Sequence, residues 1–259
     1  MTPKIVHTLN VLGLIGVLVV NFLASYLPIG GFTTGELSDK YNSLFTPAGF
    51  TFSIWGIIYL ALIAWTVFVA WGLYRGSTSS DRILNLIGPW FVINCIANAS
   101  WIFVWHYQYI LLSLLFMFII WLSLFQIYRA IDVAWLENDQ QTAFTVGLPF
   151  SIYFGWISVA LIANISVYLK SMEWGGFGVS EPLWTMIIMA IVGVLGLYVL
   201  WKERDRAFVL VFAWALWGIS KSQASADYNQ IGQTALIICA ILLVGILYSI
   251  YARWRFGRK

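Results

Sequence analysis

The chain has 259 residues, of which 61% are hydrophobic and only 10% are charged, and its mean hydropathy is +0.85. A soluble domain carries roughly 25% charged residues, so this composition excludes an ordinary soluble protein. The net charge of +3 at pH 7 is small and does not indicate a nucleic-acid partner.

Long apolar segments dominate the sequence. A helix needs about 20 apolar residues to cross the hydrocarbon core of a bilayer. The segments contain no acidic residue and a single lysine, Lys221. The sequence therefore predicts an all-α polytopic membrane protein with about eight transmembrane helices. We place them at residues 5–27, 48–74, 83–105, 108–129, 142–168, 183–201, 207–226 and 230–252.

Basic residues in the loops predict the orientation. Eleven lysines and arginines fall on the side that holds both termini, and only Lys40, Lys170 and Lys221 fall on the other. Because positive loops stay in the cytoplasm, both termini are expected to be cytoplasmic, in a bacterial inner membrane. The side with the termini holds Lys4, Arg75, Arg82, Arg129, Lys202, Arg204, Arg206, Arg253, Arg255, Arg258 and Lys259.

Residues 28–47 form the longest segment that is expected to be non-helical. Its glycines permit tight turns, and Pro28 and Pro47 mark its ends. Twenty residues are more than two antiparallel helices need, and such loops serve either as lids over a binding site or as plain connections. A second glycine-rich connection, residues 169–182, lies on the same expected face.

No catalytic or metal-binding pattern is present. Cys95 and Cys239 both lie in apolar segments, and His7 and His106 fall at opposite expected membrane faces. No nucleophile–base pair stands out either. The sequence therefore predicts no catalytic residue, no metal site and no required cofactor.

Three motifs lie on the predicted helices. In the second helix, Pro47 is followed eight residues later by Trp55 and then four residues later by Tyr59, which shares a helix face with Trp55. The third helix contains Asn94, Asn98 and Trp101. The fifth helix has Trp156, Ala160 and Asn164 in one stripe, spaced four and four.

This set of motifs resembles the tryptophan-rich sensory protein family, also called the TspO or translocator protein (peripheral benzodiazepine receptor) family. The resemblance covers residues 5–168, and the last three predicted helices lie outside it. It implies a five-helix bundle over residues 1–168 and an additional three-helix membrane extension over 169–259. The chain departs from the family pattern at Thr51, where a phenylalanine is usual, and by having a single proline before the second helix.

The family resemblance also implies a ligand. Similar proteins bind porphyrins, haem or sterols in a pocket beneath the loop between the first two helices, and they often form homodimers. The implied lid and rim residues are Lys40, Tyr41 and Pro47. The implied ligand-binding residues are Trp55, Tyr59, Asn98, Trp101, Trp156, Ala160 and Asn164.

Each of these residues also has a purely structural interpretation. Asn94, Asn98 and Asn164 are typical of hydrogen bonds between membrane helices, and Lys221 can extend its amine to the interface. Tryptophans near the ends of spans are typical of the aromatic belt. The tryptophans near the ends of predicted spans are Trp71, Trp105, Trp135, Trp174, Trp184, Trp201 and Trp254.

The leading functional prediction is a membrane receptor or binding protein for a flat apolar ligand such as a porphyrin, haem or sterol. Any chemistry would be limited to tryptophan-assisted breakdown of a bound porphyrin. The alternative is an eight-helix transporter of a small organic solute or lipid, in which the polar end of the seventh helix lines the path. A third reading is a structural membrane protein whose aromatic residues serve packing alone.

Overall fold

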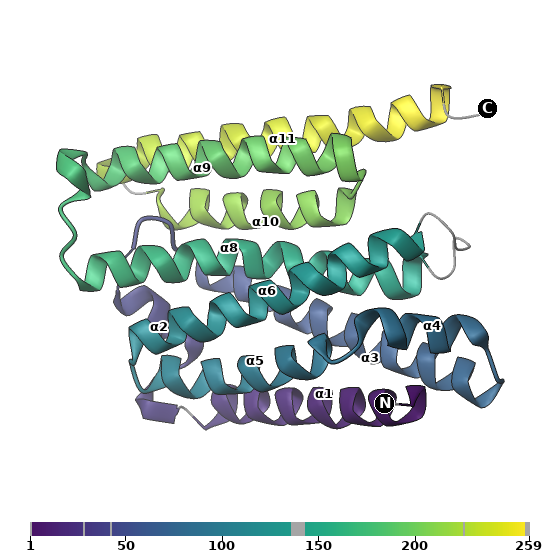
Figure 1. Ribbon diagram of the computed structural model, residues 1–259. Coiled ribbons are helices and arrows are strands. Elements are labelled where there is room, and N and C mark those ends of the chain that lie inside the picture. The colour runs from purple at the N-terminus through teal and green to yellow at the C-terminus, as the bar shows by residue number, and fades with distance from the viewer. Residues whose placement is uncertain (1, 28, 42, 136–142, 225, 257–259) are drawn as a thin grey trace. The chain divides into compact units, whose positions relative to one another are not determined.

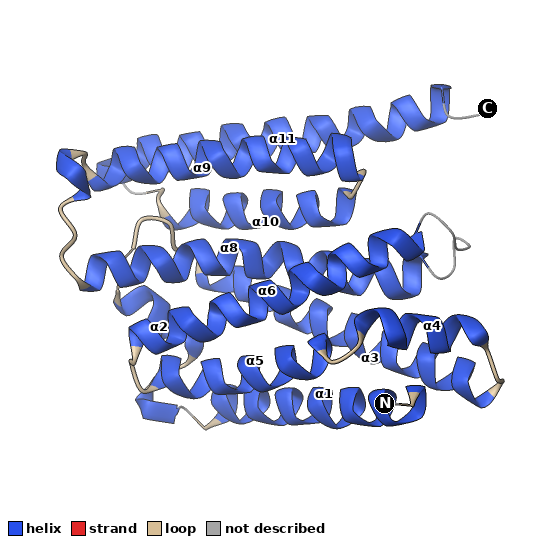
Figure 2. Ribbon diagram, viewed as in Figure 1, coloured by secondary structure: helices blue, strands red, loops and turns tan. Residues whose placement is uncertain are grey.

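The structure, a computed structural model, describes residues 2–27, 29–41, 43–135, 143–224 and 226–256, and most of these residues are helical. Figure 2 shows helices joined by short loops and no strand in these ranges. The all-α prediction is confirmed. Residues 1, 28, 42, 136–142, 225 and 257–259 lie outside the description, and with them Pro28, Arg258 and Lys259.

The first half of the chain contains α1 (Pro3–Tyr26), η1 (Ile29–Gly31), α2 (Thr34–Lys40), η2 (Gly49–Ser53), α3 (Ile54–Tyr74), α4 (Thr78–Ile87), α5 (Trp90–His106) and α6 (Ile110–Trp135). The second half contains η3 (Ala143–Gly147), α8 (Leu148–Ser171), η4 (Gly176–Gly178), α9 (Glu181–Tyr198), η5 (Val199–Glu203), α10 (Arg206–Ser222), η6 (Ala226–Tyr228) and α11 (Asn229–Phe256).

Six helical segments among the described residues are long and apolar enough to cross a membrane, and a bent pair brings the number to seven when it is counted as one span. The pair is α4 and α5, which replace the single third helix expected at 83–105 and meet at an angle of 52°. Gly88 and Pro89 cause the bend, because Gly88 adopts a φ of 52° and a proline interrupts helical hydrogen bonding. The seventh expected helix is α10, which has only 17 residues.

The sequence predicted a non-helical connection at residues 28–47. This prediction is wrong for part of the segment, because the segment contains α2. Thr33 and Glu36 form a capping box: the Glu36 carboxylate accepts from the Thr33 backbone N–H (2.8 Å) and hydroxyl (2.9 Å), and the Glu36 N–H donates to the Thr33 hydroxyl at 3.3 Å. These bonds stabilise the first turn of a helix. The threonine–x–x–glutamate spacing was a readable signal for α2.

The chain divides into two compact units. The first comprises residues 1–37 and 53–164, and the second comprises 38–52 and 165–259. This division assigns the end of the first loop to the same unit as the last three helices, although the loop precedes them by more than a hundred residues in the sequence.

In the first unit, α1 packs on α3, α4 and α5, and α6 packs on α4 and α5. Its core includes the fully buried Trp65, whose ring lies 4.9 Å from those of both Phe91 and Phe150. In the second unit, α9, α10 and α11 lie side by side as three packed helices. Apolar side chains that remain exposed on these helices suit a lipid environment.

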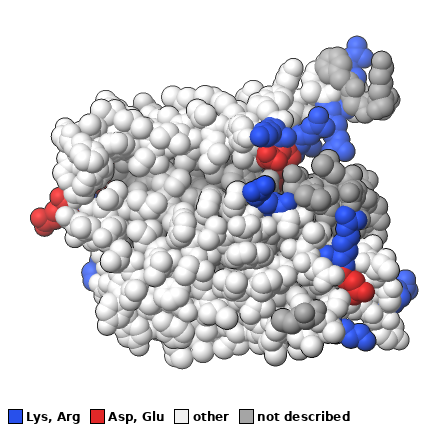
Figure 3. All heavy atoms as spheres, in the orientation of Figure 1, with Lys and Arg blue, Asp and Glu red and all other residues white. Residues whose placement is uncertain are grey.

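Charged side chains gather at helix ends in both units, and the face drawn in Figure 3 is otherwise almost free of charge. In the second unit, the Arg206 guanidinium at the start of α10 donates to the side chain (2.8 Å) and backbone oxygen (3.1 Å) of Ser249 near the end of α11. Burial, and after it the positive charges of the nearby Arg253 and Arg204, lowers the pKa of the Arg206 guanidinium. The assignment of these ends to the cytoplasm stays a prediction.

Candidate functional site

Aromatic side chains from α3 and α8 meet in the first unit. Trp55 and Tyr59 stack with ring centroids 5.4 Å apart, one helical turn from each other. The Trp55 ring also meets Tyr153 edge-on at 5.7 Å and Trp156 at 6.4 Å. We call Trp55, Tyr59, Tyr153 and Trp156 the aromatic cluster. Tyr153 and Trp156 are buried, whereas Trp55 and Tyr59 are only partly covered.

A network of side-chain amides is hydrogen-bonded to Tyr153 of this cluster. The Asn98 side-chain amide on α5 donates to the Tyr153 hydroxyl at 2.9 Å, and its oxygen accepts from the Asn21 amide on α1 at 3.0 Å. Asn21 also donates to the Val17 carbonyl at 2.9 Å. Asn98 is only 1% exposed, so these bonds form away from water. Three helices thereby hold Tyr153 in one orientation.

Several buried polar side-chain atoms of the first unit make no standard hydrogen bond within the described chain, and they include atoms of two residues of the family motifs. The Tyr59 hydroxyl lies near Asn98 but without a bond of good geometry, and the Trp101 indole N–H on α5 has no acceptor. Buried polar groups are nearly always paired in proteins. Tyr59 and Trp101 therefore each present an unused hydrogen-bonding atom to their surroundings.

The remaining predicted binding residues make contacts elsewhere in the first unit. Trp101 stacks on Trp105 at 5.7 Å. Asn164 exchanges hydrogen bonds of 3.3 Å with the Ser113 hydroxyl on α6. Ala160 is half-buried on α8, one turn beyond Trp156. The structure thus brings Trp55, Tyr59, Asn98 and Trp156 together, while the contacts of Trp101 and Asn164 lie with other partners.

A comparison with protein families tests the resemblance that the sequence motifs indicate. A family model described as TSPO-like protein matches residues 7–248. The chain belongs to the TSPO-like protein family. Comparison with curated proteins and with solved structures found no match.

The extent of the match corrects one expectation. The resemblance had been limited to residues 5–168, but the family model continues through α9, α10 and most of α11. The last three helices therefore lie inside the family pattern. Family membership and the apolar helices show an integral membrane protein in a lipid bilayer, and the family suggests a role in ligand binding or transport.

Three residues that lie in or near the candidate site of the first unit were not identified from the sequence. Tyr153 lies three residues before Trp156 on the same helix face, and Asn21 is a polar residue in an apolar span, so both had weak signals. Trp105 was assigned to the aromatic belt, but it is buried at 3% exposure and donates to the Thr34 carbonyl at 3.4 Å. It lies at a helix end yet points inward, where α5 meets the loop after α1.

The other belt tryptophans differ from Trp105 in their exposure. Trp71, Trp174, Trp201 and Trp254 are exposed, as a belt position requires. Trp184 is half-buried and donates to the Gly176 carbonyl at 2.7 Å. The side chain of Trp135 lies outside the described part of the chain.

The start of the first loop is fixed to the end of α5. His106 is buried, its Nδ1 lies 2.7 Å from the Ile102 carbonyl, and its Nε2 lies 3.5 Å from the Thr34 hydroxyl. Gly30, with a φ of 70°, passes so close that a Cβ there would lie 2.7 Å from the His106 carbonyl oxygen. His106 therefore has a packing role, and the described residues contain no group of three or more potential metal ligands.

The predicted lid and rim residues belong to the second unit. Lys40 ends α2 and is exposed, whereas Tyr41 is half-buried, and this burial raises the pKa of its phenol. Pro47 is buried against α10, where it lies near Gly218. Their contact with a ligand stays a prediction.

Proposed function

We propose that this TSPO-like family member is a membrane receptor that binds a flat apolar ligand, such as a porphyrin, haem or sterol, at the aromatic cluster. The observation that carries the proposal is the pair of unused polar atoms, the Tyr59 hydroxyl and the Trp101 indole N–H. Both belong to residues that match the family motifs: Tyr59 lies in the aromatic cluster, and Trp101 stacks on Trp105 outside it. The expected cytoplasmic termini and homodimer accompany this proposal.

The physical argument combines ring contacts with hydrogen bonding. An aromatic pair contributes about 0.5–1.5 kcal/mol beyond its buried area, so a large π-surface that reaches Trp55 and Tyr59 gains from each ring. A buried polar atom without a partner costs about 1–3 kcal/mol. A ligand that offers an acceptor to either residue removes that cost, which a purely structural cluster does not.

The test is a titration of the purified protein in nanodiscs with protoporphyrin, followed by its absorbance so that tryptophan variants remain comparable. Tyr59→Phe removes only the hydroxyl and is expected to weaken binding about 3- to 10-fold. Trp55→Phe and Trp156→Phe should weaken it as well. Trp254→Phe, at an exposed ring near the end of α11, is the matched control and should bind like the wild type.

Binding that does not saturate, or that weakens equally in the Trp254→Phe control, would refute the proposed site. In that case the transporter alternative becomes the leading hypothesis. Its test is uptake of a labelled solute into proteoliposomes with Lys221→Ala. Lys221 is exposed at the end of α10, so loss of flux without loss of folding would support a path along that helix.

A further inference from the structure

Residues 43–52, which we call the docking segment, lie against the middle of α10 within the second unit. The Ala48 N–H donates to the Gly218 carbonyl oxygen at 3.1 Å. The Trp214 indole N–H donates to the Thr51 carbonyl oxygen at 3.0 Å. A segment from the first loop is thus bonded through its backbone to a helix that follows it by about 160 residues.

Aromatic rings add to these two hydrogen bonds. The Phe50 ring meets the Trp214 ring edge-on at 5.7 Å and the Trp217 ring at 5.0 Å. Trp214 and Trp217 themselves lie 5.3 Å apart. Such edge-on pairs are favourable and fix the relative position of the rings.

Gly218 is required for this close approach. A Cβ at position 218 would collide with the Thr51 hydroxyl oxygen and would lie 2.9 Å from the Thr51 methyl and 3.1 Å from the Pro47 Cβ. Thr51 is fully buried. A small side chain at position 51 is therefore required where the docking segment meets Gly218.

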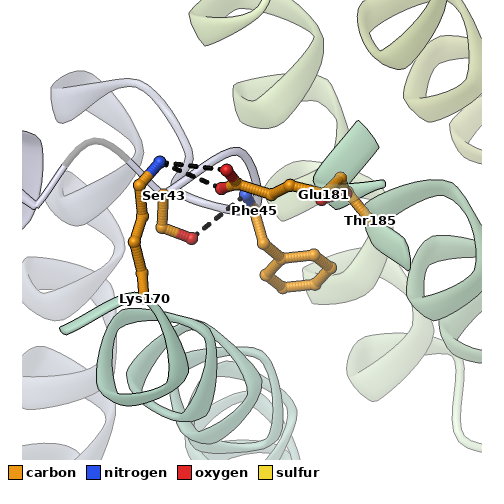
Figure 4. A network of polar contacts seen from close by, with 5 residues as sticks. All are labelled: Ser43, Phe45, Lys170, Glu181 and Thr185. Atoms are coloured by element: carbon orange, nitrogen blue, oxygen red, sulfur yellow. Dashed lines mark hydrogen bonds and ion pairs between the residues drawn. The ribbon is translucent and has the colours of Figure 1, made fainter. Parts of the chain in front are cut away.

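The beginning of the docking segment is also buried in the second unit. The Ser43 hydroxyl accepts from the Phe45 N–H at 3.4 Å, and the exposed fraction of Phe45 is 1%. Figure 4 shows these two residues in the same close-up as the ion pair of Lys170 and Glu181, whose atoms are 3.0 Å apart. The ion pair joins the end of α8 to the start of α9.

We propose that Trp214 and Gly218 are positioning residues for the docking segment and, through the unbroken chain, for the first turn of α3, the helix that carries Trp55 and Tyr59. The docking segment continues through η2 into α3 without a break, and Thr51 precedes Trp55 by only four residues. By holding Pro47, Ala48 and Thr51, α10 limits the motion of the residues directly before α3, so the first turn of that helix frays less. The consequence for ligand affinity rests on the proposed function, whereas the docking itself does not.

The experiment measures amide hydrogen exchange of the full-length protein in nanodiscs, read separately for residues 43–52 and 53–60. Trp214→Phe removes the hydrogen bond to Thr51, and Gly218→Ala introduces the clash. Both variants are expected to exchange roughly 3- to 10-fold faster in both peptides. Gly16→Ala is the control, because Gly16 lies in α1 and a Cβ there would meet nothing within 4 Å.

A second-site variant distinguishes positioning from general destabilisation. Thr51→Ala deletes the two atoms that an alanine at position 218 would strike, so Gly218→Ala combined with Thr51→Ala should return exchange to within about twofold of Thr51→Ala alone. Unchanged exchange in both single variants would overturn the docking. Faster exchange in 43–52 but not in 53–60 would overturn the positioning of α3.

Protoporphyrin affinity of the same variants separates this proposal from the proposed function. If the wild type binds, Gly218→Ala should weaken binding several-fold and the double variant should restore it; an unchanged affinity with faster exchange would overturn the role in binding. If the wild type binds no porphyrin, the proposed function fails, and the exchange of residues 53–60 alone decides the positioning of α3.

Discussion

The two units hold their helices together by different chemistry. In the first, side-chain amides bridge helices: Asn98 bonds Tyr153 at 2.9 Å, and Asn94 donates to Ser123 at 3.0 Å. In the second, glycines allow close approach. A Cβ at Gly193 would lie 2.6 Å from Ile238, and one at Gly196 would lie 2.9 Å from Leu242.

This difference shows where binding groups are available. Membrane helices gain little from burying apolar surface against one another, because lipid is equally apolar, so they associate through polar bonds or close packing. Amide bridges leave polar atoms inside the bundle, and glycine contacts leave none. The first unit thus contains the candidate site, while the second is held together by close packing. Close packing is not exclusive to the second, since Gly13 meets Cys95 where α1 crosses α5.

The largest effect is expected from filling a glycine contact in the second unit. A Cβ at Gly232 would lie 2.9 Å from the Gln223 carbonyl oxygen and 3.2 Å from that of Ser220, and backbone atoms do not move aside easily. Gly232→Ala should therefore lower the free energy of unfolding by about 1–3 kcal/mol. Thermal unfolding followed by circular dichroism measures this change. A midpoint equal to that of Gly16→Ala would contradict close packing as the stabilising feature.

A smaller effect is expected from removing an amide bridge in the first unit. Asn98→Leu leaves the Tyr153 hydroxyl without its donor and Asn21 without its acceptor. The expected loss is about 1–2 kcal/mol, since bonds between membrane helices contribute roughly 0.6–1.7 kcal/mol each.

Asn164→Leu is the matched comparison, because the Asn164–Ser113 bonds are longer at 3.3 Å and should contribute less. The same unfolding measurement ranks the two variants. Equal midpoints for both would show that the central network has no special weight in the first unit.

The smallest effect tests the same kind of polar bond in water. Thr33 donates two hydrogen bonds to the exposed Glu36 carboxyl, and they lower its pKa from the ordinary value of 4.5. The bond from the backbone N–H has the larger effect, and the bond from the hydroxyl has the smaller one. A lowered pKa means that the capping bonds stabilise α2 fully above pH 4.5 and lose this effect as the pH falls through the folded-state pKa.

Nuclear magnetic resonance titration of the Glu36 carboxyl should therefore give a pKa below 4.5. Thr33→Ala removes the hydroxyl donor, so the pKa should rise part of the way toward the ordinary value. A titration that is identical in the wild type and Thr33→Ala would show that the hydroxyl does not contribute to the cap. The Thr33–Glu36 bonds are exposed to water and the Asn98–Tyr153 bond is buried, so burial is the main difference between the two pairs.

Much of the candidate site was readable before its geometry was known. Trp55 and Tyr59 share a helix face because they are four residues apart, and the stacking of their rings follows from that spacing. Which rings of other helices would meet them was not readable. Tyr153 joins the cluster because of how α3 and α8 are rotated, which no local pattern encodes, whereas Trp101 and Trp105 stack because they too are four residues apart, on α5.

The sequence by itself determined the class of the protein, since long apolar segments without acidic residues are stable only as helices in lipid. It also determined the family, because the motif spacings are local properties of single helices. Only the tertiary structure decided that Asn98 bonds Tyr153, that α4 and α5 bend, and that residues 43–52 dock on α10. Contacts between distant segments depend on helix rotation and on side-chain volume at both partners, and Gly218 acquires its meaning only beside Thr51.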